Sequence, residues 1–189
     1  IVPRPTDPTS TKQWSPFDLR FDRVVTAVDG NRITVDAPLA CAISEEWGGG
    51  EIVAYRDPGR IDHVGIENLR GDSEFNRAIT ATEKDHDGRA LRYLGDEAHA
   101  LRVVAFDDVK NGWVRNVVAV HFYHGVCDIG EAAKWITVQD SASLDPVSLI
   151  TGGRRYPFAI EGQLNLVQRC YSSDDRHAFV FGARVPGPT

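Results

Sequence analysis

The sequence predicts an all-β protein built as a parallel β-helix, a solenoid in which each turn of the chain adds short strands beside those of the previous turn. Two observations lead to this fold class. Strand-like segments recur along residues 60–189, and several start 21 or 22 positions apart, which fits one turn of such a solenoid. Most of these segments are separated by polar corners instead of two-residue hairpin turns. A β-sandwich is the alternative, but its strands recur at shorter intervals.

Two families of segments carry the repeat. The first family comprises VGIENL (64–69), WVRNVV (113–118), WITVQD (135–140) and NLVQRC (165–170), and the second comprises RVVAF (102–106), HGVCDIG (124–130), YPFAIEG (156–162) and HAFVFG (177–182). Side chains alternate between the two faces of a strand, so part of each segment must face the interior. The expected core residues are Ile136, Val138, Phe158, Ile160, Leu166 and Val167. Trp113 and Trp135 begin equivalent segments, and we expect them to stack within the core.

The chain divides into two parts. Residues 1–59 read as an extended, proline-rich lead-in that carries a β-hairpin over 23–36, around a Gly-Asn turn, and one further short strand over 51–56. Residues 60–189 read as the coils of the solenoid. They are interrupted by a polar insertion at 73–101, which we expect to be a loop with a short helix.

Composition narrows the classes of partner. The net charge is −6, so no overall positive field attracts nucleic acid, and no segment is apolar enough to cross a membrane. The three cysteines, Cys41, Cys127 and Cys170, lack metal-binding spacings and are expected to be small buried thiols.

The chain begins at Ile1 and contains no Met, which indicates a piece of a longer protein.

Several segments resemble one family. They are GRIDHVGIE (59–67), DEAH (96–99), AKW (133–135), LDPVS (144–148), GGRRY (152–156), QRC (168–170) and the stretch from RH to PGP (176–188). Together they resemble right-handed parallel β-helix proteins of the pectate-lyase-like superfamily, in a poorly characterised secreted bacterial branch. The resemblance implies a right-handed winding, a polysaccharide or oligosaccharide partner, and a secreted or periplasmic location. It leaves the activity open, because such folds include lyases, hydrolases, epimerases and non-catalytic binding domains.

The segment TGGRRY offers the best candidates for binding an acidic sugar. β-Elimination of a uronate polysaccharide needs a group that neutralises the sugar carboxylate and a base that removes the neighbouring proton. Arg154 and Arg155 follow a flexible Gly-Gly pair and can present planar donors to carboxylates, and Tyr156 can stack on a sugar ring. The alternative is a pair of surface arginines that bind nearby acidic side chains.

A second cluster follows one coil later. His177 can serve as a general base or acid, and Asp174 and Asp175 add carboxylates beside it. We therefore predict Arg155, His177 and Asp174 as catalytic residues. Arg154, Tyr156, Asp175 and His124 are predicted to bind substrate. The alternative for the aspartates is a corner turn in which they bind their own backbone.

Two other functions stay open at this point. A glycoside hydrolase needs two carboxylates at a defined separation, for which the candidates are Asp140, Asp145, Asp174 and Asp175. The other alternative function is that of a non-catalytic fragment of a solenoid, which binds carbohydrate or has a structural role. In either case the exposed ends of a solenoid can pair with one another, which would allow self-association.

The sequence predicts no cofactor and no metal. His121 and His124 would face opposite sides of a strand. Calcium has oxygen donors available in Asp107, Asp108, Asp140 and Asp145, but no calcium-binding motif supports it.

Overall fold

The computed structural model describes residues 19–47, 49–182 and 185, and the predicted lead-in over 1–18 lies outside them. The described chain is all-β, with a single turn of 3-10 helix, η1 (Glu45–Trp47), as its one helical element. No helix in this part of the chain has the length and hydrophobicity needed to cross a bilayer. The all-β prediction is confirmed.

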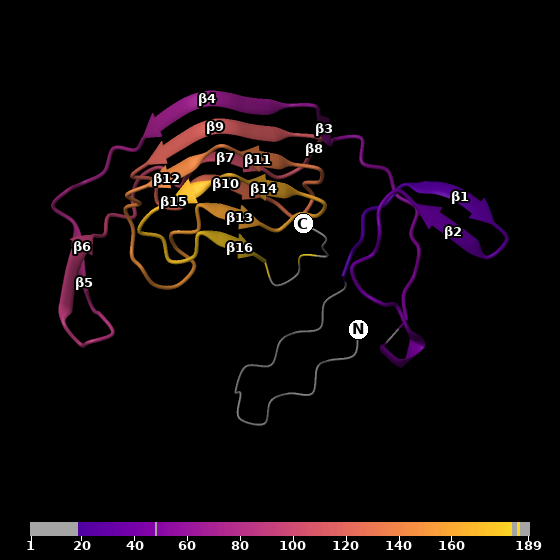
Figure 1. Ribbon diagram of the computed structural model, residues 1–189, viewed down its shortest axis with the longest axis horizontal. Coiled ribbons are helices and arrows are strands. Elements are labelled where there is room, and N and C mark those ends of the chain that lie inside the picture. The colour runs from indigo at the N-terminus through magenta and orange to yellow at the C-terminus, as the bar shows by residue number, and fades with distance from the viewer. Residues whose placement is uncertain (1–18, 48, 183–184, 186–189) are drawn as a thin grey trace.

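A four-stranded parallel sheet forms one wall of the molecule. Its strands are β7 (Arg102–Phe106), β10 (Gly125–Ile129), β13 (Phe158–Ile160) and β16 (Phe179–Phe181), and each pairs with the next of these along the chain (Figure 1). Cys127 pairs with Val104 and with Phe158, and Phe158 pairs with Phe179, 21 positions later. The segments of the second sequence family therefore do lie side by side, in parallel.

A six-stranded parallel sheet forms the opposite wall. It contains β4 (Gly65–Asp72), β9 (Trp113–Val120), β11 (Thr137–Gln139), β12 (Ala142–Leu144), β14 (Leu166–Gln168) and β15 (Tyr171–Ser172). The long strand β9 pairs with β4 on one side, and with both β11 and β12 on the other. The short parallel pair β3 (Ile61–Asp62) and β8 (Val109–Lys110) lies beside these walls.

Left-handed backbone conformations bend the chain at matching positions. Asn68 and Asn116 have φ near +55°, and the side-chain amide of Asn116 donates to that of Asn68 over 2.8 Å. Asp140 and Arg169 have the same conformation at the next two levels and form an ion pair. Asn and Asp tolerate this region better than most residues, which explains their recurrence at the corners.

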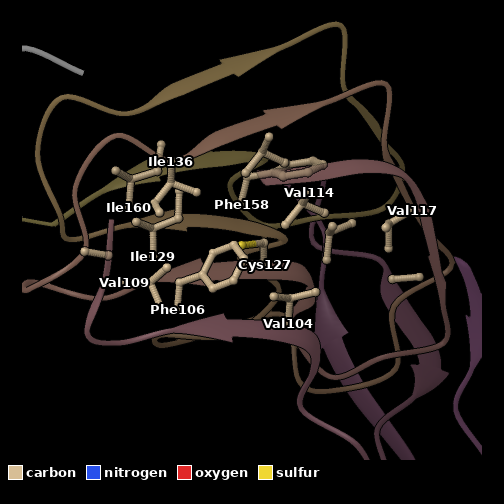
Figure 2. Packing of buried hydrophobic residues seen from close by; sticks show 14 residues of the cluster. Val104, Phe106, Val109, Val114, Val117, Cys127, Ile129, Ile136, Phe158 and Ile160 are labelled. Carbon is tan, nitrogen blue, oxygen red and sulfur yellow. The ribbon is translucent and has the colours of Figure 1, made fainter. Parts of the chain in front are cut away.

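The hydrophobic core lies between the two walls. Figure 2 shows Val104, Cys127 and Phe158 from the four-stranded sheet packing with Val114 and Val117 from β9. Each of these five residues is at most 4% exposed. The core is therefore built from residues of parallel strands that lie far apart in the sequence.

Of the six predicted core residues, four are buried, one is partly buried and one is exposed. Ile136, Val138, Phe158 and Ile160 are at most 3% exposed, whereas Leu166 is 48% exposed. Leu166 pairs with Thr137 and Val167 pairs with the buried Val138, so the pleat turns Val167 inward and Leu166 outward. Val167 is partly buried against the core.

The predicted tryptophan stack is wrong. Trp113 is partly buried and lies across Gly65, and its indole nitrogen donates to Glu67 over 2.6 Å. Trp135 is 42% exposed and has φ of 60°, because it lies at a corner and not in a strand. The two side chains therefore occupy different environments.

The hairpin predicted over 23–36 is confirmed as β1 (Val25–Asp29) and β2 (Arg32–Val35), which pair antiparallel. The strand predicted over 51–56 is absent, since that segment has no regular structure and Ile52 and Val53 are at least 67% exposed. Without a partner strand, its run of apolar residues does not form the half-buried surface that a strand needs.

The insertion at 73–101 forms a second hairpin in place of the expected loop and short helix. Strands β5 (Thr80–Lys84) and β6 (Ala90–Leu94) pair antiparallel. The carboxylate of Asp85 accepts hydrogen bonds from the amides of Asp87 and Arg89, and Gly88 has φ of +78°. This aspartate-glycine turn reverses the chain where the polar composition suggested a loop.

Candidate functional site

An open groove of about 320 Å³ lies on the outer face of the four-stranded sheet. The residues that line it are Arg102, Asp107, His124, Asp128, Ile129, Gly130, Tyr156, Ala159 and Glu161. Asp128 and Ala159 are register partners, and their neighbours Cys127 and Phe158 are buried in the core. Alternation along the strands therefore turns Asp128 away from the core and into the groove.

Arg102 and Asp128 form an ion pair at the centre of the groove. A guanidinium nitrogen of Arg102 lies 2.6 Å from a carboxylate oxygen of Asp128, and each side chain is 28% exposed. Both residues belong to regular strands, β7 and β10, which hold the backbone on either side of the pair. The pair is thus fixed on a rigid sheet.

Other carboxylates border the groove where the strands end. Asp107 follows β7 directly, and Glu161 follows β13. The Glu161 carboxylate lies so close to Gly182 that a Cβ atom there would be 2.1 Å from it. Any larger residue at this position would require the Glu161 carboxylate to move.

The surroundings of the groove shift the pKa values of Asp128 and His124 in opposite directions. Burial raises the pKa of Asp128 to about 6, with Arg102 opposing the shift and Asp107 and Glu161 adding to it. Burial, together with Arg102, lowers the pKa of His124 to about 4. At neutral pH the groove therefore holds a neutral imidazole, and a carboxyl group that gains its proton in mildly acidic solution.

Three buried polar atoms of this groove have no hydrogen-bond partner among the described residues. They are Nε of Arg102, Nδ1 of His124 and Oδ1 of Asp128. Buried polar groups in folded proteins are nearly always bonded, and each exception calls for an explanation such as a catalytic role or a bound water or ion. The other such atoms of the described residues belong to Asn165 and Asp175. Three such atoms in one groove mark it as the strongest candidate site in the described part of the chain.

A row of three rings follows the edge of the sheet where the strands begin. The ring centroids of His124 and Tyr156 are 6.4 Å apart, and those of Tyr156 and His177 are 5.4 Å apart. Each ring belongs to a residue one or two positions before its strand (β10, β13 and β16). The structure therefore brings together three of the residues that the sequence singled out.

The two predicted arginines do not lie in the groove. Arg155 is 6% exposed, and its guanidinium donates to the backbone carbonyls of Ser148 and Asp174. Arg154 forms an ion pair with Glu97, in the chain segment that follows β6. Both guanidiniums hold chain segments together, and the local sequence gives no sign of these partners.

The predicted aspartates also lie apart from the groove lining. Asp174 is exposed, with φ of 54°, and its carbonyl accepts from Arg155. Asp175 is partly buried, and burial raises its pKa to about 6. Asp140 is paired with Arg169 at a corner of the six-stranded sheet, and the amide of Asp145 donates to Ser173.

Sequence reasoning did not single out the groove residues Arg102, Asp128 and Glu161, and it considered Asp107 only as an oxygen donor for calcium. A signal was present, since Asp128 interrupts the apolar run GVCDIG and Arg102 opens RVVAF. A charged residue inside a buried-strand pattern must face outward or be paired. The described residues contain no cluster of three His, Cys, Asp or Glu side chains arranged to hold a metal ion.

Comparison with known proteins identifies no relative of this chain. The chain matches no protein-family model, and neither the curated proteins nor the solved structures give a significant match.

Proposed function

We propose that the chain belongs to the right-handed parallel β-helix proteins of the pectate-lyase-like superfamily, is secreted or periplasmic, and hydrolyses a polysaccharide in the groove. Parallel pairing of strands about one repeat apart, a core stacked along the strands and left-handed corner residues at matching levels support the β-helix. The hydrolytic activity rests on one observation, the raised pKa of Asp128 beside two further carboxylates in an open groove.

The proposed reaction uses Asp128 as the general acid. Its protonated carboxyl gives a proton to the glycosidic oxygen as the bond from that oxygen to the anomeric carbon breaks. Asp107 or Glu161 takes a proton from water, whose oxygen bonds to the anomeric carbon. The products are two shorter sugar chains, one with a new reducing end. Arg102 holds Asp128 in place and keeps its pKa from rising further.

Elimination from a uronate is the second candidate. It is favoured by the neutral imidazole of His124 beside the cation of Arg102, because a base and a carboxylate-binding group are both required. Three carboxylates against one arginine, however, repel an acidic substrate from this groove. Hydrolysis of an uncharged sugar chain is therefore the better supported reaction.

A substrate panel separates the two reactions. Neutral and uronate polysaccharides are incubated with the protein, and new reducing ends and the ultraviolet absorbance of unsaturated products are followed together. Hydrolysis gives reducing ends without absorbance, and Asp128→Asn should lower the rate by roughly a hundredfold or more. The matched control is Asp140→Asn, which removes a carboxylate from the other sheet and should leave the rate unchanged.

Each contrary result has a definite meaning. Unsaturated products that disappear in His124→Ala would establish elimination in place of hydrolysis. Full activity in Asp128→Asn would remove Asp128 from the reaction, and absence of both products on every substrate would leave a binding solenoid.

A further inference from the structure

We propose that the rings of His124, Tyr156 and His177 form a sugar-binding row, and that it takes three consecutive units of an uncharged oligosaccharide that runs across the strands. The inference rests on the proposed function, since it assumes that the groove receives a carbohydrate. It adds the direction of the bound chain, its charge class and the residues that select it.

The spacing of the row matches the spacing of the strands. Neighbouring strands lie about 4.8 Å apart, so a linear ligand that crosses a parallel sheet meets one equivalent side chain per strand. The centroid separations of 6.4 and 5.4 Å show that the three rings follow this step from β10 to β13 to β16. The rings are tilted by 40° and 44° to their neighbours, so they do not close against each other face to face.

The row and the carboxylates lie on opposite borders of the groove. His124 and Tyr156 precede their strands, whereas Asp107 and Glu161 follow theirs, and Asp128 lies between the two borders. A sugar above the sheet can therefore contact a ring on one side while its glycosidic oxygen faces the carboxyl group of Asp128. His177 continues the row one strand beyond the groove lining.

Tyr156 is held in place before any ligand arrives. Its hydroxyl donates to the carbonyl of Gly152 over 3.2 Å and accepts from Arg176 over 2.6 Å. The Arg176 guanidinium also lies 6.0 Å from the ring centroid and bonds the Gly152 carbonyl. A ring fixed from one side loses little freedom on binding, which favours affinity.

The charge of this surface indicates the ligand class. The carboxylates of Asp107, Asp128 and Glu161 face the bound chain, and Arg102 is already paired with Asp128. A uronate would place its own carboxylate against them, whereas neutral pyranoses present hydroxyls to these acceptors and apolar ring faces to Tyr156.

Binding is measured in the Asp128→Asn protein, which keeps the sugar intact. Calorimetric titrations use cello-, xylo- and manno-oligosaccharides from disaccharide to tetrasaccharide, with oligogalacturonates as the acidic counterpart. On the neutral series that binds, adding Tyr156→Ala should weaken affinity about tenfold. Tyr156→Phe keeps the ring and should bind almost normally. Tyr171→Ala, which removes a 61%-exposed tyrosine from β15, is the matched control and should change nothing.

His177 gives a separate readout of chain length. In His177→Ala, the gain in affinity from disaccharide to trisaccharide should disappear while disaccharide binding is kept. Oligogalacturonates are also titrated into the wild-type protein, in which the Arg102–Asp128 pair is intact. Unchanged affinity in Tyr156→Ala, or tighter binding of oligogalacturonates to the wild-type protein than of every neutral series to Asp128→Asn, would overturn the row. If the row variants lose binding but the wild-type protein cleaves nothing, the row stands and the hydrolytic function fails.

Discussion

Two arginines at the edge of the same sheet have opposite surroundings. Arg102 opens β7 and pairs with Asp128 in the groove, with 28% of its side chain exposed. Arg155 precedes β13 and is 6% exposed, with its three donor nitrogens on backbone carbonyls. The partners that each guanidinium meets decide its role. One arginine fixes a titratable group beside open space, and the other holds together two chain segments.

Removal of Arg155 should have the largest effect on stability. Arg155→Ala should lower the free energy of unfolding by about 3 kcal/mol, because it leaves the buried carbonyl of Ser148, and the carbonyl of Asp174, without their donors. Arg154→Ala is the matched change one residue earlier, where a partly exposed ion pair with Glu97 is lost, and should cost at most about 1 kcal/mol. Urea denaturation of both variants measures the difference. Equal losses would show that burial does not separate these arginines.

Much of the fold follows from the sequence because it rests on local patterns. The strand segments, the parallel pairing and the first hairpin were readable from alternation, spacing and one turn. The hairpin over 80–94 was not, because its turn depends on the Asp85 side chain bonding its own backbone. Leu166 and Val167 show a second limit, since a shift of one position exchanges core and surface.

The site was only partly predictable for a related reason. The sequence analysis identified Tyr156 as a ring that can stack on a sugar, His177 as a general base or acid, and His124 as a substrate-binding residue. The structure brings their three rings together. Their neighbours across the sheet depend on register. Residues that pair on successive strands of the four-stranded sheet are separated in the sequence by 23, 31 and 21 positions. Loop lengths therefore set which charged residues meet, and the sequence alone does not fix the pairing of Arg102 with Asp128.

Removing the other arginine tests the groove side of the comparison. In Arg102→Gln the pKa of Asp128 should rise above about 6 and that of His124 above about 4, because the Arg102 cation lowers both. Carbon-13 carboxyl and nitrogen-15 imidazole titrations by NMR measure the two shifts. The matched change is Arg115→Gln, which breaks the pair with Glu67 on the six-stranded sheet and should move neither group.

The smallest expected effect concerns Asp175, beside the corner that Arg155 holds. Burial raises its folded pKa to about 6, above the unfolded value of about 3.9, so between these values the folded protein binds more protons. Stability must then fall as pH rises from 4 to 6. Asp175→Asn removes this contribution, and the loss of unfolding free energy between pH 4 and 7 should shrink by roughly 1 kcal/mol after allowance for solvent screening.

Asp140 supplies the control with the opposite sign. The hydrogen bond and charge of Arg169 lower its pKa, so its stabilising contribution is present above the unfolded pKa and is lost as pH falls. Asp140→Asn should therefore make the protein less sensitive to acid, whereas Asp175→Asn makes it less sensitive to rising pH. Denaturation series of both variants across this pH range measure the slopes. Changes of the same sign in the two variants would mean that partial burial does not raise the pKa of Asp175. The electrostatic difference between the corner around Arg155 and the open groove would then be smaller than the exposed fractions of their side chains imply.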